Sequence, residues 1–489
     1  MSSASEVSVY DRMCWPEAEL ERALALGTHR LELAAYLGGS EYATLAALAR
    51  QAMARQAMAR RGIARRGAAS RPMADRRRVP AARPRLKVYL LPGILGSQLG
   101  LPRSAGQPPD LLWIDPADIV HGRLTELRLT RATTRGALPA VRPALAGRPP
   151  PAVRPPPAVR PLGAIVYSYL ALKLRLAAAG FDVVLYDYDW RGDLLATGRA
   201  LADRLAADDA GELALIGHSM GALVARAAIA SYGSRAGAER ITRLIGLGAP
   251  HGGSIAAVQA LRASYPIVGR LAAIDRIHDA ERLTRLAFRG FVSLYQLLPT
   301  TSAGVAASAT ASASAALDLF DPGVWPQGGA RPYPALLRAA RHFGSQLAPP
   351  DARFVSIVGT GQRTVTSVQR RGQQFRYQIS SAGDGTVACA RATLPGVPSY
   401  SLRCEHGELP RSPDVAAALV DLLRRGRTRR LREGVSARHG RSSFVTDASL
   451  RRELGRKIDW YRLSIGERRQ YLNRLNAAPA SYRAPRIVR

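Results

Sequence analysis

Cysteine, lysine and long apolar stretches are scarce in this sequence. The three cysteines, Cys14, Cys389 and Cys404, are few and odd in number, which argues against a fold held together by disulfides. No stretch reaches the roughly 18 uninterrupted apolar residues that a membrane-spanning helix needs. The first 15 residues lack the basic start and apolar centre of a secretory signal. We therefore expect a soluble, cytoplasmic protein, whose 47% hydrophobic residues are enough for a sizeable core.

The net charge of +33 is carried almost wholly by arginine, because only 3 of the 70 basic residues are lysine. A strongly basic chain raises the question of nucleic-acid binding. However, residues 164–260 hold nine basic and nine acidic side chains, and the excess lies in 50–88 (net +12) and 424–489 (net +14). These flanks offer peripheral contact to anionic lipid head groups. The alternative, which we favour, is that they are solvated basic tails, and we expect no nucleic-acid partner.

Composition divides the chain into three segments. Ala, Leu and Glu favour helix over residues 16–60, and the Arg, Ala and Pro of 61–85 are typical of a linker. Proline repeats mark an insert at about 138–161, and an Ala/Ser-rich stretch spans 302–316. The predicted segments are a helical N-terminal region with its linker (1–84), a central domain with cap insertions at about 98–163 and 250–350 (85–425), and a basic helical tail (426–489).

The central domain (85–425) shows alternating strand and helix patterns. Short apolar runs alternate with segments whose apolar residues recur with a period near 3.6. Strict alternation of this kind predicts an α/β fold with a mainly parallel central sheet flanked by helices. The predicted strands are 86–91, 181–186, 212–216, 241–247, 353–358 and 375–379, and the predicted helices are 164–179, 193–206, 221–230 and 412–423.

The sequence Gly-His-Ser-Met-Gly at 217–221 has the Gly-x-Ser-x-Gly spacing of a serine nucleophile. It directly follows an apolar predicted strand and directly precedes a predicted helix. In that context the serine occupies a sharp turn that lifts its hydroxyl above the sheet edge, and glycines without Cβ atoms leave room for the turn. Ser219 is therefore the predicted nucleophile.

A serine nucleophile needs a base, and the base needs an orienting carboxylate. In α/β-hydrolases the chain order is Ser, then Asp or Glu, then His. His406 follows a late strand and precedes the last predicted helix, whereas His439 lies in the basic tail and His342 precedes the acid candidate. That candidate is Asp384, between two glycines after the strand that ends near Ile379. We predict Asp384 as the acid and His406 as the base.

Two backbone N–H groups are predicted to stabilise the oxyanion. The N–H of Met220 opens the helix after the nucleophile, and the second donor should come from the glycine-containing loop 91–97. Gly93 permits a tight bend, which favours Ile94 over Leu95 as that donor. No metal or cofactor is expected.

Several motifs together resemble the lecithin:cholesterol acyltransferase-like branch of the α/β-hydrolases. They occur in the expected order over about 330 residues of the chain. The resemblance implies a lipase or acyltransferase fold in which Ser219, Asp384 and His406 match the triad. The motifs are LPGILGSQL (91–99), YDWR (188–191), GHSMG (217–221), LGAPHGGS (247–254), SLYQLLP (293–299) and GDGTV (383–387), with His406.

The chain also departs from that family. Ala388 stands where the family often has proline, and Ala249 stands where it often has threonine. No disulfide-closed lid is visible, so acyl transfer to a sterol does not carry over. We expect a serine esterase or lipase that hydrolyses acyl esters of lipid-like substrates. The alternatives are an acyltransferase with an alcohol acceptor and a non-catalytic scaffold that binds membrane or nucleic acid.

Overall fold

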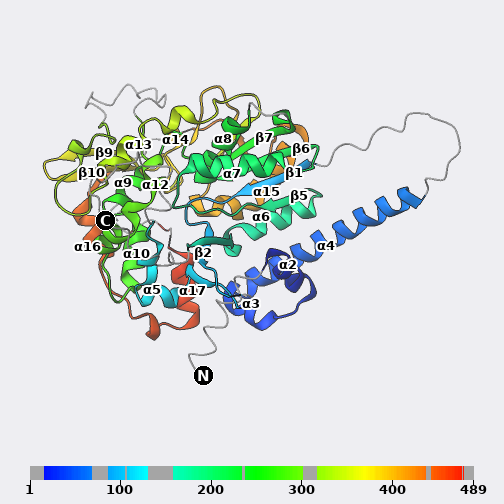
Figure 1. Cartoon of the computed structure of the whole chain (residues 1–489), viewed down its shortest axis with the longest axis horizontal. Coiled ribbons are helices and arrows are strands. Elements are labelled where there is room, and N and C mark those ends of the chain that lie inside the picture. The colour runs from blue at the N-terminus through cyan, green and yellow to red at the C-terminus, as the bar shows by residue number, and fades with distance from the viewer. Residues whose placement is uncertain are drawn as a thin grey trace, which may run out of the picture.

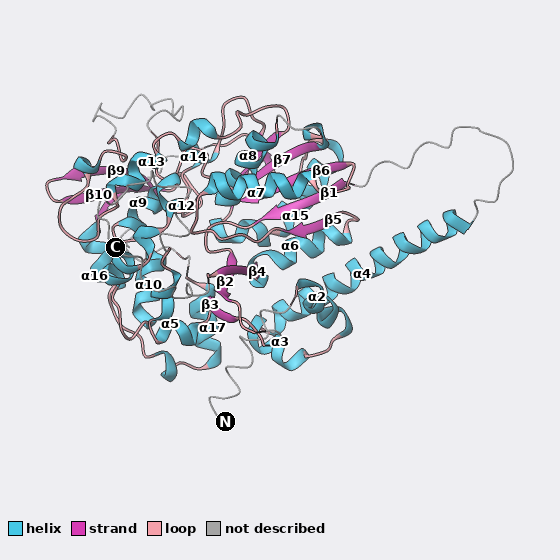
Figure 2. Cartoon of the chain, in the orientation of Figure 1, coloured by secondary structure: helices cyan, strands magenta, loops and turns pink. Residues whose placement is uncertain are grey.

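The computed structural model of the chain describes residues 16–68, 86–104, 107–129, 158–233, 237–300, 317–436 and 442–475, with Ala477 and Pro479. Most of the predicted proline-rich insert and all of the Ala/Ser-rich stretch lie outside these residues. Figures 1 and 2 show a sheet with helices on both faces, and a group of N-terminal helices beside it.

Seven strands form the central sheet, in the order β12-β11-β8-β7-β6-β1-β5. All neighbours pair in parallel except the short edge strand β12, which is antiparallel to β11. The expected mainly parallel sheet is therefore confirmed. Its strands are β1 (Leu86–Leu91), β5 (Asp182–Leu185), β6 (Glu212–His218), β7 (Ile241–Leu247), β8 (Phe354–Thr360), β11 (Ser399–Arg403) and β12 (Arg432–Glu433).

Helices cover both faces of this sheet. The helices of the described residues are α2 (Glu17–Leu26), α3 (Arg30–Leu37), α4 (Gly39–Ala68), α5 (Pro116–Val120), α6 (Val166–Ala178), α7 (Leu194–Ala206), α8 (Met220–Tyr232), α9 (Ile255–Leu261), α10 (Pro266–Ile274), α11 (Ala280–Leu286), α12 (Val292–Gln296), α13 (Pro334–Ala340), α14 (Cys389–Ala392), α15 (Pro413–Arg425), α16 (Asp447–Leu454) and α17 (Ile465–Asn473). Of these, α6 and α15 contribute to the core cluster on one face of the sheet, and α7 and α8 contribute to the cluster on the other face. None of the helices in the described part of the chain combines the length and apolar character needed to cross a membrane.

Strand β1 shows how the alternation of side chains builds two cores. Successive side chains of a strand point to opposite faces of the sheet. Val88 and Leu90 join the cluster that contains α6 and α15 residues, while Tyr89 and Leu91 join the cluster that contains α7 and α8 residues. A strand that is buried on both faces has a continuous run of apolar residues, so its bounds can be predicted from the sequence.

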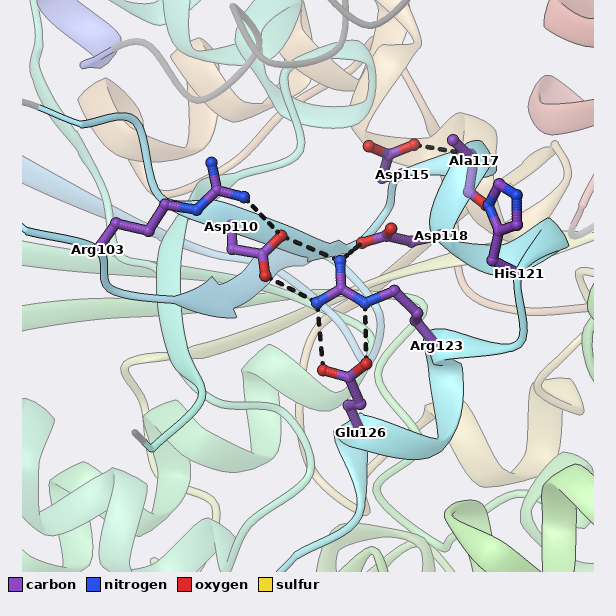
Figure 3. A network of polar contacts seen from close by, with 8 residues as sticks. All are labelled: Arg103, Asp110, Asp115, Ala117, Asp118, His121, Arg123 and Glu126. Carbon is purple, nitrogen blue, oxygen red and sulfur yellow. Dashed lines mark hydrogen bonds and ion pairs between the residues drawn. The ribbon is translucent and has the colours of Figure 1, made fainter. Parts of the chain in front are cut away.

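A small antiparallel sheet, β3-β2-β4, lies almost wholly within the segment predicted as the first cap insertion (98–163), with β2 at Ser97–Leu101, β3 at Asp110–Trp113 and β4 at Arg160–Ala164. Figure 3 shows the guanidinium of Arg123 held by the carboxylates of Asp110, Asp118 and Glu126. Burial raises the pKa of Asp118 to about 6, although Arg123 opposes that shift. This network ties the helical turn η2 (Arg123–Leu127) to β3 and α5.

A second antiparallel sheet, β13-β10-β9, stands apart from the central one. Strands β9 (Thr364–Arg371) and β10 (Gln374–Ser380) form a hairpin that leaves the sheet after β8 and returns toward it. The predicted strand 375–379 is therefore confirmed, but it belongs to this hairpin. Strand β13 (Ser443–Thr446), from the predicted basic tail, completes the sheet.

The C-terminal segment packs against the cap helices. Asp447 at the start of α16 is fully buried, where it accepts hydrogen bonds from Arg262 Nε (3.0 Å) and Tyr377 Oη (2.5 Å). Lys457 donates to three backbone carbonyls at the end of α10 and just after it. The charge of Lys457 therefore serves contacts within the protein.

The N-terminal helices α2, α3 and α4 pack on α6. Their apolar residues share a cluster with Leu170 and Leu174 of α6, and Lys173 pairs with Glu17 and Glu21. Helix α4 continues to Ala68, eight residues into the segment predicted as a linker (61–85), because Ala and Arg both favour helix. Figure 1 shows its second half extending away from the body of the protein.

Candidate active site

Ser219 stands on a strained turn between β6 and α8. Its backbone angles are φ 53° and ψ −126°, a left-handed region that a residue other than glycine rarely adopts. Its N–H donates to the carbonyl of Leu247 at the end of β7 (2.8 Å). The turn is thus fixed to the neighbouring strand, and the serine lies at the carboxyl edge of the sheet.

The two flanking glycines are required by close backbone contacts. A Cβ on Gly217 would lie 2.3 Å from the nitrogen of Ala222, and one on Gly221 would lie 2.5 Å from the carbonyl oxygens of Leu91 and Pro92. Both approaches are closer than any side-chain carbon tolerates. The Gly-x-Ser-x-Gly spacing therefore reflects the packing of the turn against α8 and β1.

Asp384 and His406 contact each other directly. His406 Nδ1 lies 2.7 Å from Asp384 Oδ2, and the His406 N–H donates to the carbonyl of Asp384 (2.8 Å). The other carboxylate oxygen, Oδ1, accepts the N–H groups of Thr386 (3.0 Å) and Val387 (2.7 Å). Asp384 is buried, so this carboxylate has a fixed position, and it engages Nδ1 and not Nε2 of His406.

The end of β7 links the serine to this pair. Leu247 accepts the N–H of Ser219, and the next residue, Gly248, lies directly beneath the acid and the base. A Cβ on Gly248 would be 2.9 Å from Asp384 Oδ2 and 3.0 Å from His406 Nδ1. One strand end therefore supports all three predicted triad residues.

The loop after β1 lies against the serine and is fixed by aromatic side chains. A Cβ on Gly93 would come within 2.9 Å of the Ser219 Cβ. Tyr188 Oη donates to the carbonyl of Pro92 (2.6 Å), and Trp113 Nε1 donates to the carbonyl of Leu95 (2.9 Å). Leu95 itself has a positive φ of 63°. These bonds hold the loop in one conformation beside the nucleophile.

Both predicted oxyanion donors belong to this neighbourhood. Met220 is the first residue of α8, and the first N–H groups of a helix have no acceptor within it. The N–H of Ile94 donates to no acceptor among the described residues. Two unpaired donors beside a serine hydroxyl are what an oxyanion site requires.

His218 occupies the space between this loop and His406. Its Nδ1 lies 2.9 Å from Tyr169 Oη, and its Nε2 lies 3.0 Å from the carbonyl oxygen of His406. The rings of His218 and His406 are 4.8 Å apart. Burial, together with the nearby His406, lowers the pKa of His218 to about 3. His218 is therefore neutral at physiological pH.

An apolar cavity of about 80 Å³ is lined in part by Ser219. The loop after β1 forms one wall with Ile94 and Leu95, and Trp190 stands beside them. The cap insertion supplies most of the rest, including small residues from α9 and large ones around α12. These cap residues include Ala256, Ala257, Ala260, Leu271, Phe288 and Phe291.

No local pattern in the sequence predicts the hydrogen bonds of three residues that fix the site. Tyr169 lies in the apolar stripe of a predicted helix, and only its packing shows that its hydroxyl contacts Gly93 and His218. Tyr188 and Trp113 act through single hydrogen bonds to distant carbonyls. In contrast, the pairing of Arg191 with Asp189 (2.7 Å) joins neighbours in the chain.

Part of the chain matches a known protein family. Residues 179–318 match the model of the lecithin:cholesterol acyltransferase family, which confirms the resemblance that the motifs indicated. The matched range includes Ser219, whereas Asp384 and His406 lie beyond its end. No curated protein matches the chain in sequence.

Two solved structures show a weak likeness to the chain. The structure of the Tle4-Tli4 complex has 15% identity and a TM-score of 0.38, and covers 70% of this chain and 98% of its own. The lipase BlEst2 of Bacillus licheniformis, in its mature form, has 12% identity and a TM-score of 0.32, with 73% and 96% covered. At these scores the likenesses carry no conclusion about this chain.

Proposed function

We propose that this chain is a serine esterase or lipase that acts on acyl esters, with Ser219 as nucleophile, and the match of residues 179–318 to the lecithin:cholesterol acyltransferase family supports this proposal. The observation that carries the proposal is the strained turn of Ser219, which opens onto an apolar cavity. The hydrogen-bonded pair of Asp384 and His406, supported by the same strand end, supplies the acid and the base.

The proposed reaction proceeds through an acyl-enzyme. His406 Nε2 accepts the hydroxyl proton of Ser219 as Oγ attacks the ester carbonyl. The N–H groups of Met220 and Ile94 hold the oxyanion of the tetrahedral intermediate. The C–O bond to the leaving alcohol then breaks, and His406 returns the proton to that alcohol.

Deacylation repeats these steps with water. His406 deprotonates a water molecule, which attacks the acyl-enzyme, and the carboxylic acid leaves as Ser219 regains its proton. Asp384 accepts a hydrogen bond from Nδ1–H throughout, which stabilises the imidazolium without itself being protonated. An alcohol in place of water would give a new ester, and the product of the deacylation step distinguishes these outcomes.

The cavity indicates the substrate class. Its lining is almost entirely aliphatic and aromatic, so it offers no partner for a charged or hydroxylated acyl group. An acyl chain that leaves water for such a cavity gains about 0.8 kcal/mol for each buried CH₂. We therefore expect activity to rise with acyl chain length until the cavity is filled.

The first test is hydrolysis of p-nitrophenyl esters of graded chain length by the wild type and by Ser219→Ala. We expect measurable wild-type turnover that rises with chain length, and loss of at least about 10⁴-fold in the variant. Added alcohol reveals transfer by the appearance of its ester. Absence of wild-type turnover on every ester would contradict the proposal and favour a non-catalytic scaffold.

A second test addresses the acyl cavity. Ala260 of α9 lines the cavity, and a phenyl ring at this position would fill part of it. Ala260→Phe should lower kcat/KM on the longest accepted chain by about tenfold and leave the shortest ester nearly unchanged. Ala230→Phe, at an exposed position of α8, is the matched control. An equal loss on short and long esters would remove the cavity from the proposal.

A further inference from the structure

A chain of three hydrogen bonds crosses the site beneath Ser219. The N–H of Gly93 donates to Tyr169 Oη (2.9 Å), Tyr169 Oη lies 2.9 Å from His218 Nδ1, and His218 Nε2 lies 3.0 Å from the carbonyl oxygen of His406. Its members come from the loop after β1, from α6, from the end of β6 and from the turn η7 (His406–Arg411). These segments are distant in the sequence.

The chemistry of the acceptors fixes the direction of every bond. A carbonyl oxygen only accepts, so Nε2 of His218 must carry the proton. A neutral imidazole then has Nδ1 as its acceptor, and the Tyr169 hydroxyl must donate to it. The oxygen of that hydroxyl accepts the N–H of Gly93. Neutral His218, in keeping with its burial, gives every donor of these bonds an acceptor, whereas an imidazolium would donate from Nδ1 and leave the Tyr169 hydroxyl proton without an acceptor among the described residues.

We propose that Tyr169 and His218 are positioning residues that couple the oxyanion loop to the backbone of the catalytic base. The proposal rests on the proposed function of Ser219, Asp384 and His406. Gly93 precedes the proposed oxyanion donor Ile94, and the acceptor at the other end belongs to the proposed base itself. The series of hydrogen bonds also passes through His218, the residue just before the nucleophile. It therefore connects the oxyanion loop, the nucleophile and the base, whose relative positions must stay fixed.

A purely structural role accounts poorly for this arrangement. Tyr169 and His218 are both buried, and leaving such polar groups without partners costs about 1–3 kcal/mol each. Apolar residues of similar shape would fill the same volume without that free-energy cost. Polar residues at both positions are instead useful where backbone atoms of two catalytic segments must be held in register, because a displacement of 1 Å costs about 100-fold in rate.

Three single variants separate the bonds. Tyr169→Phe removes the first two and keeps the ring. His218→Gln places an amide nitrogen near the position of Nε2, so it keeps the bond to His406 and loses the bond to Tyr169. His218→Asn places an amide oxygen near the position of Nδ1, so it keeps the bond to Tyr169 and loses the bond to His406.

Tyr295→Phe is the matched control. Tyr295 is also fully buried, and its hydroxyl likewise accepts one backbone N–H, from Tyr333 (2.8 Å), and donates once, to the carbonyl of Arg289 (2.6 Å). It is not a neighbour of the triad. Its substitution removes the same kinds of bond and should leave kcat within about twofold of the wild type.

The decisive readout is the split between kcat and KM on a p-nitrophenyl ester. We expect each of the three variants to lower kcat roughly 10- to 100-fold with KM changed by less than about twofold, because the acyl cavity is untouched. Tyr169→Phe combined with His218→Gln should lose less than the product of the two single effects, because both remove the same bond. The control should show neither effect.

Other outcomes separate the two proposals. Wild-type turnover with kcat unchanged in the three variants, or lowered equally in Tyr295→Phe, would overturn the coupling and leave the serine mechanism in place. Absence of wild-type turnover would overturn the mechanism. Nitrogen NMR of His218 reports independently of activity: the neutral Nε2–H tautomer is expected at pH 5–8, and an Nδ1–H tautomer or an imidazolium would contradict the bond directions.

Discussion

Ser219 is placed by two consecutive elements, whereas Asp384 and His406 are placed by segments that leave the central sheet and return. The serine turn joins β6 directly to α8, with Gly217 at the end of β6 and Gly221 at the start of α8. Asp384 follows the hairpin of β9 and β10, which projects from the sheet after β8, and His406 follows β11. A short local pattern therefore determines the position of the nucleophile, whereas the position of the acid–base pair depends on long-range packing.

Substitutions in the serine turn and in the acid–base pair should therefore have different effects. A change within the serine turn meets backbone atoms and disturbs folding. A change of the acid meets only side-chain and loop contacts, so it can remove activity and leave the fold intact.

Asp384→Asn is expected to have the largest effect. It keeps the size of the side chain but replaces the oxygen that accepts from His406 Nδ1, so the imidazole loses its orientation and its tautomer. We expect kcat to fall about 10⁴-fold with a cooperative unfolding transition retained. Kinetics together with thermal unfolding check this, and Asp351→Asn, in an exposed pair with Arg353, is the control. Activity above about a tenth of wild type would show that another carboxylate serves as the acid.

Gly221→Ala should disrupt the serine turn and lower the stability of the fold. Its Cβ would lie 2.5 Å from two carbonyl oxygens, so the serine turn or β1 must shift. We expect a loss of about 3 kcal/mol in the free energy of unfolding, together with loss of turnover. Gly466→Ala, at a helical position of α17 with open space around it, should change stability by at most about 1 kcal/mol, in the favourable direction. Similar stability for the two variants would refute the packing argument.

The pH dependence of the free energy of unfolding tests His218, which lies between the serine turn and His406. The pKa of His218 is about 3 in the folded chain against an ordinary value of 6.5, so the unfolded chain binds a proton that the folded chain excludes. The free energy of unfolding should therefore fall as the pH drops from 6.5 toward 3, by about 1.4 kcal/mol per pH unit for this group. His218→Gln should make the dependence shallower by that amount in denaturant titrations. An unchanged slope would mean that His218 is protonated in the folded protein.

Local patterns were enough to predict much of the fold. The bounds of β1 and β7 match their predicted ranges, and α7, α8 and α15 begin within one residue and end within two residues of theirs. Apolar runs buried on both faces of the sheet and clear helix caps, such as Ser412 before α15, make these elements legible.

Other features depend on partners far away in the chain. Residues 375–379 read correctly as a strand, but nothing in them indicates that β10 pairs with β9 and β13 outside the central sheet. The contacts of Tyr169 and Trp113 with the loop after β1 are invisible for the same reason. Sequence motifs thus pointed to the reacting groups, and tertiary packing supplied the residues that hold them.

The most direct test of the serine mechanism is to map the adduct of a fluorophosphonate by mass spectrometry while ester turnover is followed. The account predicts one adduct for each chain, located on Ser219, with turnover lost in proportion to its formation and no adduct in Ser219→Ala. Turnover that persists when Ser219 is fully modified, or an adduct on another residue that accounts for the loss, would contradict it.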